Sequence, residues 1–505
     1  MFPLYKIHCR LFPLMTLLFR ETLSSQAKDD PPSGCQPLPP VASFSTQVGA
    51  AETRAGRSKE VHPLVLPKLH PLGKVDRLLI LVSGTGVTKL LSVPKLEFGS
   101  GLAMANALVE ALHDWGVADQ VVGMCFDTTA SNTGSRSGAC LLIEQQLGRD
   151  LLNVDSRHHV LELIAAMAYA VCLNSPSSGP QIPLFTRFQD KWDLIDQDQH
   201  EIMPDDHLTE AIRDSRDNLI AGLKLHLSQF QPREDYRELL ELSVIVLGGM
   251  PARGIRFRRP GAHHHARWMA KLIYAVKIYL FRRQANLTAR ESAGILRYVK
   301  FIVSVYVRAW YAAPSPTSAP ANDLAHLKDL VGYEDKSLAK ALADSFARRH
   351  LRYLSESLVP LAFFDEDLSL GRKRTMIEAL SSNEGSIDLT KRAVVDLKAD
   401  LSQKTLADFV TKSSRMFFVT LGIDDGFLET DPAEWHDDPR YVAAARKVNG
   451  IRVLNDFAER GVALMEDYNL TLTKDEDQTQ YILQLVEAHR GRFPDANKST
   501  VTRPH

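Results

Sequence analysis

The chain has 505 residues, of which 45% are hydrophobic and 24% charged, and its 60 basic and 61 acidic side chains give a formal net charge of −1. This is the composition of an ordinary globular protein of about two to four domains, and it excludes a disordered chain, a collagen-like repeat and a small disulfide scaffold. The five cysteines show no paired spacing, which indicates reduced intracellular thiols and offers no zinc finger.

Residues 1–60 are expected to be a disordered N-terminal extension. Residues 11–19 form a short apolar stretch behind Lys6 and Arg10, so residues 1–25 resemble a secretory signal, but no clean cleavage site follows. We therefore favour an intracellular protein, with a signal as the alternative. Residues 22–60 are rich in Ser, Pro, Gly and Ala, which predicts disorder. No apolar run reaches the roughly 18–20 residues of a membrane span, so no membrane partner is expected.

Residues 61–175 are expected to form an α/β unit. Apolar runs at 77–82, 88–96 and 121–126 predict strands, and the apolar spacing at 102–115, 138–147 and 158–171 predicts helices. Residues 176–400 show helical periodicity almost throughout and predict an all-α insertion domain. An acidic connector at 401–440 precedes two helices, 441–468 and 474–490, which are expected to complete the core before a tail at 491–505. The predicted architecture is an α/β core interrupted by a large helical insertion.

The segment 253–300 is strongly basic. It holds twelve Lys and Arg residues and one acid, Glu291, a local balance of +11 that leaves −12 for the rest of the chain. Basic side chains neutralise phosphates and interleaved aromatic rings stack on unpaired bases, so the segment indicates nucleic-acid contact. The alternative is a solvated helix face whose aromatic rings point into the core. The candidate contacts are Arg253, Arg256, Arg258, Arg259, Arg267, Trp268, Lys271, Lys277, Arg282 and Arg283.

Asp127 is the candidate of greatest chemical interest. It ends an apolar run and opens into a polar turn, a position from which a carboxylate can hold a divalent metal at the edge of a sheet. The more common role of such an Asp is to cap the turn through neighbouring backbone amides.

Several segments together resemble a group of transposon-derived proteins of invertebrate genomes that is similar to hAT-type DNA transposases. They are CFDTTASNTG at 125–134, GAC at 138–140, RHHVLE at 157–162, REDYREL at 233–239, HHARWMAK at 264–271 and NDFAERG at 455–461. The order and spacing of these segments agree over roughly residues 75–490.

The resemblance implies a ribonuclease-H-like core, split by a helical insertion, with two Mg²⁺ or Mn²⁺ ions on an Asp–Asp–Glu triad. Such a metal pair activates the nucleophile and stabilises the leaving oxygen during attack on a phosphodiester. Asp127 matches the second Asp and Glu459 the Glu, which without the resemblance would be an ordinary helical acid. His159 matches a histidine of a Cys-x-x-His pattern in which this chain has Ser156 in place of the cysteine. A histidine here could touch the scissile phosphate or simply pack the helix.

The first Asp of the triad has no counterpart. There is no acid between Glu60 and Asp76, and Asp76 precedes its strand instead of ending one. Three prolines at 63, 67 and 71 also cannot donate to the hydrogen-bond ladder of a central strand. The sequence therefore predicts a nuclease fold whose metal site is incomplete.

We expect a transposase-derived, nuclear DNA-binding protein that has lost catalysis and that can form a homo-oligomer. An active metal-dependent transposase or nuclease, completed by another acid such as Asp76 or Glu60, is the first alternative. A helical protein-interaction scaffold that does not bind nucleic acid is the second.

Overall fold

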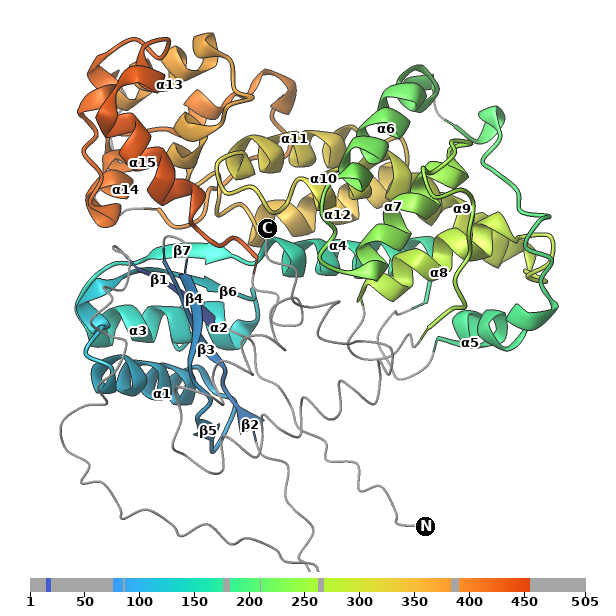
Figure 1. The fold of residues 1–505 in the computed structure, drawn as a ribbon, viewed down its shortest axis with the longest axis horizontal. Coiled ribbons are helices and arrows are strands. Elements are labelled where there is room, and N and C mark those ends of the chain that lie inside the picture. Colours follow the sequence, from blue (N-terminus) through green and yellow to red (C-terminus); the bar gives the residue numbers. More distant parts are fainter. Residues whose placement is uncertain are drawn as a thin grey trace, which may run out of the picture.

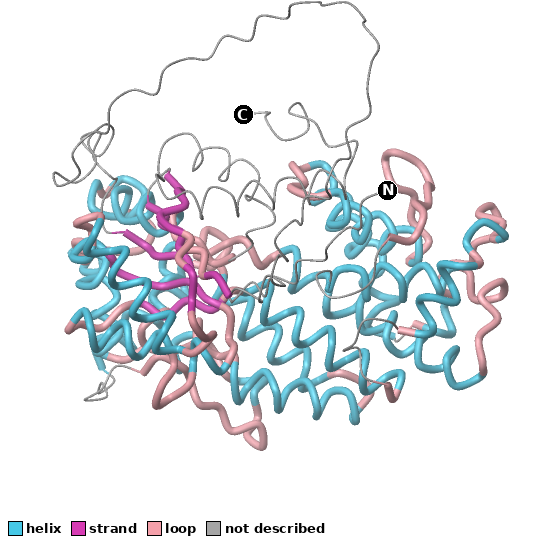
Figure 2. Tube along the Cα trace, turned by 90° about the horizontal axis from the view of Figure 1, so that it is seen from below, coloured by secondary structure: helices cyan, strands magenta, loops and turns pink. Residues whose placement is uncertain are grey.

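The computed structural model describes residues 15–19, 76–84, 87–175, 182–208, 210–261, 268–382 and 390–454. Figure 1 shows an α/β unit built on one main sheet beside a larger helical unit, with helix α4 running from the sheet into the helices. Figure 2 shows the strands gathered at one end of the molecule. An α/β unit followed by a helical unit is the predicted layout, and a ribonuclease-H-like core remains a prediction.

The main sheet has five strands in the order β4-β3-β1-β6-β7. The β6 strand runs parallel to β7, and β1 runs parallel to β3 but antiparallel to β6. These strands are β1 (Met15–Phe19), β3 (Ile80–Gly84), β4 (Val87–Ser92), β6 (Val121–Phe126) and β7 (Leu152–Asp155), while β2 (Asp76–Arg77) and β5 (Lys95–Leu96) form a separate pair.

The central strand β1 corrects the prediction for the N-terminal residues. Residues 15–19 lie between β3 and β6 in the sheet, with Met15 opposite both Ile80 and Phe126, and are not disordered. Their sequence, MTLLF, has the length of a buried strand, but periodicity alone does not distinguish so short an apolar run from the core of a signal. The rest of the predicted extension at 1–60 lies outside the described residues. Residues 61–75, where the resemblance places the first Asp of the triad, also lie outside them.

Both faces of the sheet are covered, so all six residues of β6 are buried. Met124 and Phe126 pack with helices α1 (Gly101–Asp114) and α3 (Ala139–Leu147) in one core. Cys125, on the opposite face, belongs to the core of the helical unit. The strand therefore joins the two cores, and its C-terminal end lies at their junction.

The helical unit begins with α4 (Arg157–Leu173). It continues with α5 (Pro183–Asp190), α6 (Glu210–Ser228), α7 (Glu234–Val246), α8 (Trp268–Leu280), α9 (Ala289–Phe301), α10 (Val307–Tyr311), α11 (Ala319–Gly332), α12 (Lys336–Arg349) and α13 (Leu370–Ser382). One π-helical turn, Ile302–Tyr306, joins α9 to α10.

The C-terminal part differs from its prediction in two places. The expected connector at 401–440 contains α14 (Met416–Leu421) and packs its aromatic residues into the core, where Trp435 is buried. The helix predicted at 441–468 is α15 (Pro439–Asn449), which ends where Gly450 follows, because glycine weakens a helix interior. Residues 451–454 are not helical, and the Val453 carbonyl accepts a hydrogen bond from the Arg157 amide at the start of α4, at 3.0 Å. The helix predicted at 474–490 lies outside the described residues.

Candidate functional site

Two aspartates meet at the C-terminal ends of β6 and β7. In the parallel register Phe126 lies opposite Asp155, so Asp127 is one residue beyond the end of β6 and Asp155 is the last residue of β7. Asp127 is half-buried, and its backbone carbonyl accepts a hydrogen bond from the buried Asn132 amide at 3.0 Å. Asn132 lies in the short helix α2 (Ala130–Thr133), so it ties the polar turn to the end of the strand.

Asp155 was not predicted as a site residue, because the four residues of β7 are too few for a clear periodic signal. Its carboxylate is completely buried, and its Oδ1 lies 2.6 Å from Nε of Arg352. Neither carboxylate oxygen accepts a directed hydrogen bond from a described residue, so the contact is an ion pair. Burial raises the pKa of Asp155 to about 7, against the lowering effect of the Arg352 guanidinium.

Arg352 is held in place by groups on both sides of this junction. Its guanidinium lies 5.3 Å from the centre of the Phe126 ring, and the hydroxyl of the neighbouring Tyr353 donates to the Asp155 carbonyl at 2.6 Å. The side chain is largely buried. A fixed positive charge therefore lies at the end of the strand pair that carries Asp127 and Asp155.

His159, on the first turns of α4, lies close to both aspartates. Its Nδ1 is 3.7 Å from Oε2 of Glu162. Burial lowers the pKa of His159, but the close contact with the Glu162 carboxylate and the negative charges of Asp127 and Asp155 outweigh it, so the net shift is upward. The structure thus brings together two of the predicted site residues, Asp127 and His159, and adds Asp155, Glu162 and Arg352.

The adjacent histidine, His158, packs the helix. Its ring stacks on Trp310 with the centroids 6.0 Å apart and meets the Tyr236 ring edge-on at 5.6 Å. The Tyr236 hydroxyl lies 3.4 Å from His158 Nδ1. His158 is buried, so it anchors α4 in the helical core.

The described residues do not fit the predicted two-metal site. No group of three or more His, Cys, Asp or Glu side chains in this part of the chain has the arrangement of a metal site. The Arg352 guanidinium already contacts Asp155, and a cation at that distance opposes a divalent ion on the same carboxylate. Glu459, the predicted third ligand, lies outside the described residues.

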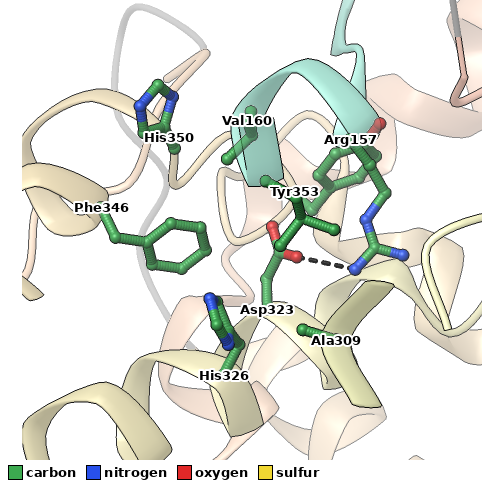
Figure 3. Close-up of a pocket in the computed structure, with 9 residues that line it drawn as sticks. Arg157, Val160, Ala309, Asp323, His326, Phe346, His350 and Tyr353 are labelled. Carbon is green, nitrogen blue, oxygen red and sulfur yellow. Dashed lines mark hydrogen bonds and ion pairs between the residues drawn. The ribbon is translucent and has the colours of Figure 1, made fainter. Parts of the chain in front are cut away.

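A second buried polar group surrounds a small cavity behind the start of α4 (Figure 3). Arg157 Nη2 donates to Asp323 Oδ1 at 2.9 Å, and its Nη1 donates to the carbonyls of residues 312 and 313. The cavity of about 20 Å³ can hold one water molecule. Within the described part of the chain, no ring nitrogen of His326 or His350 has a hydrogen-bond partner, and Phe346 lies between the two rings.

The basic segment 253–300 is largely balanced by acids from other segments. Eight of the eleven basic side chains that the structure describes in this segment form ion pairs. The acids are Asp193, Glu201, Glu234, Glu238, Glu241, Glu334 and Asp335. The local charge of +11 is therefore much reduced on the folded surface.

Lys277 corrects the list of nucleic-acid contacts. Its side chain is 1% exposed, with Nζ 2.6 Å from Glu238 Oε1 and donating to the Arg258 carbonyl at 2.6 Å. Burial lowers the pKa of Lys277, and the opposing effect of the neighbouring Glu238 carboxylate does not offset it. A side chain enclosed in this way does not reach a phosphate.

The other candidates in the basic segment divide by exposure. Arg253, Arg256, Arg258 and Arg259 are exposed in the loop between α7 and α8, and Arg283 is also exposed. Lys271 is half-buried, and Arg282 is largely buried against Glu201 at 2.8 Å. The aromatic residues Tyr274, Tyr279 and Phe281 are buried in the core, as the alternative reading expected. Arg267 and the side chain of Trp268 lie outside what the structure describes.

Comparison with protein-family models, with curated proteins and with solved structures finds no match. No described helix is both long and apolar enough to cross a membrane.

Proposed function

We propose that the chain is a transposase-derived, hAT-like protein that binds DNA without cleaving it. The absence of cleavage is supported by one observation, the buried Asp155–Arg352 pair beside Asp127. A divalent ion would have to bind a carboxylate oxygen at about 2.0–2.6 Å, and Arg352 Nε already lies 2.6 Å from one of the two Asp155 oxygens, Oδ1. The charge that a metal would supply at this end of the sheet is instead supplied by arginine.

Support for DNA binding comes from the loop at 251–261. Arg253, Arg256, Arg258 and Arg259 are all exposed there, within a stretch of seven residues. The pairs that Arg258 and Arg259 make with Glu234 and Asp193 are exposed on both sides, and exposed ion pairs contribute little, about 0–1 kcal/mol. A DNA phosphate can displace the carboxylate from such an exposed ion pair at a small cost in free energy. The arginines of this loop can therefore pair with a DNA backbone.

The salt dependence of DNA binding tests this assignment. We expect the affinity for duplex DNA to fall steeply with salt, because each neutralised phosphate contributes about −0.9 to the slope of log K against log salt. Replacing Arg256 and Arg259 with Ala should weaken binding and reduce the magnitude of the slope by about 2. Lys224→Ala, an exposed change on α6, is the matched control. A flat slope, or equal binding by all three proteins, would favour the interaction scaffold.

One observation favours an active nuclease as the second candidate. Asp127 and Asp155 end adjacent parallel strands, an arrangement that places two carboxylates at one edge of a sheet. The two proposals differ in the effect of Mn²⁺: an active nuclease nicks supercoiled plasmid and loses this activity in Asp127→Asn, whereas the DNA-binding protein nicks in neither form.

A further inference from the structure

A groove of about 670 Å³ runs along helix α12, a volume typical of a ligand-binding cleft. Its floor is formed by Ala339, Ala343 and Ala347, which recur at four-residue spacing and so lie on one face of the helix. All three alanines are buried, with 3–8% of their surface exposed, so a ligand would touch them only at the bottom of the groove.

The opposite wall is the segment 392–398. Residues 393–396 adopt neither helix nor turn, and burial alternates along them, with Ala393 and Val395 half-buried and Val394 92% exposed. This period of two is that of extended chain. The Ala393 amide donates to the Leu351 carbonyl at 2.9 Å, but among the described residues the amides of Val394, Val395 and Leu397 have no hydrogen-bond acceptor. In the extended stretch 393–396 successive amides point to opposite edges, so the Val394 and Val395 donors lie on different edges of this wall, and Leu397 already belongs to the turn that follows.

The rim of the groove carries an excess of positive charge. Its basic side chains are Lys336, Lys340, Arg348, Arg392 and Lys398, and its acids are Asp344 and Asp396. Asp344 already contacts Lys340 at 2.9 Å and Arg348 at 3.8 Å. In the described residues no acid forms an ion pair with Lys336, Arg392 or Lys398, so three cations remain for a ligand.

We propose that this groove binds an extended acidic peptide segment of a partner protein. An open amide of the 393–396 segment can donate to a peptide main chain, the alanine floor suits small aliphatic side chains, and the rim suits carboxylates. The 14 residues of α12 span about 21 Å, which about six extended residues match. A nucleic-acid strand is disfavoured because the described residues that line the groove include no aromatic ring on which a base could stack.

The test uses the full chain and an array of eight-residue peptides in which acidic and small aliphatic residues alternate. Peptides with Lys in place of every acid are the matched controls, and binding is quantified by fluorescence polarisation of the best peptide. Two changes address the groove separately: Ala343→Phe fills the floor, and Lys336→Glu with Lys398→Glu reverses the charge of the rim. Lys224→Glu makes one such charge reversal on α6, away from the groove.

We expect acidic peptides to bind in preference to basic ones, with affinity at least tenfold weaker in both groove variants and unchanged in Lys224→Glu. Circular dichroism of each variant shows whether the helical content is retained. Equal binding of acidic and basic peptides, or groove variants that fold and bind as the parent does, would overturn the proposal. Displacement of the peptide by a single-stranded oligonucleotide would assign the groove to nucleic acid, and self-association lost in both groove variants would assign it to a second copy of the chain; either result rejects the peptide.

Discussion

The buried histidine His326 should make the stability of the protein depend on pH. Its side chain is 4% exposed, and burial, with smaller contributions from Arg157 and Arg308, lowers its pKa from 6.5 to about 3. The ring is therefore neutral in the folded protein and becomes protonated on unfolding whenever the pH is below 6.5. Its contribution to stability is complete above pH 6.5 and is lost as the pH falls toward 3.

The size of this effect follows from the two pKa values. A group with a pKa of 6.5 in the unfolded chain and about 3 in the folded one lowers the unfolding free energy by about 2 kcal/mol when the pH falls from 8 to 5. His326→Leu removes the titrating ring and leaves an aliphatic side chain against Phe346, which the ring now meets edge-on at 5.1 Å. We expect the variant to gain about 2 kcal/mol relative to the parent when the pH changes from 8 to 5.

Urea unfolding of both proteins at the two pH values measures this difference directly. The Asp323 carboxyl, whose pKa burial raises to about 6 against the lowering effect of Arg157, titrates in both proteins and so cancels in the comparison. His113→Asn, a change at an exposed histidine in the last turn of α1, is the control and should follow the parent at both pH values. Equal pH dependence in the parent and in His326→Leu would refute a neutral, desolvated His326.

Three further experiments test contacts that hold the fold together. Arg352→Met should destabilise the fold by about 3–5 kcal/mol in urea unfolding, because it leaves the Asp155 carboxylate buried without its cation. The double variant Arg352→Met with Asp155→Asn should recover part of that loss. If it instead loses the sum of the unfolding free energies lost by the two single variants, the pairing of Arg352 with Asp155 is refuted. Gly101→Ala should lower the melting temperature, since its Cβ would overlap the backbone of Ser137; an unchanged melting temperature would mean that this turn yields freely. Thr288→Ala should lower the unfolding free energy by about 1 kcal/mol, because it removes the N-cap of α9. A loss below a few tenths of a kcal/mol would show that water replaces the cap.

Some of the site could be predicted because its signals are local. The six apolar residues of β6 mark a buried strand, and Asp127 follows directly from where that run ends. The helical spacing of α4 likewise places His159 near the start of a helix. Periodicity within one segment was sufficient to place both residues, but the choice of His159 as a site residue came from the family resemblance.

The rest of the site depends on contacts between distant segments. Arg352 and Asp323 reach the start of α4 from 150 to 200 residues further along the chain, and no local pattern links them to Asp155 or Arg157. The basic run shows the same limit, because a charge count over 253–300 does not include the acids from other helices that pair with it. The strand β1 was missed because a five-residue apolar run carries too little information to separate a central strand from an N-terminal signal.

Nicking of supercoiled plasmid in the presence of Mn²⁺ tests the central claim, DNA binding without cleavage, most directly. The parent and Asp127→Asn are compared at matched concentrations, and a gel-shift assay on the same samples reports whether DNA is bound. Bound DNA with no nicking above the level of Asp127→Asn is the result we predict. Nicking by the parent that disappears in Asp127→Asn would contradict the claim, and it would mean that a metal site forms beside Arg352 and cleaves DNA.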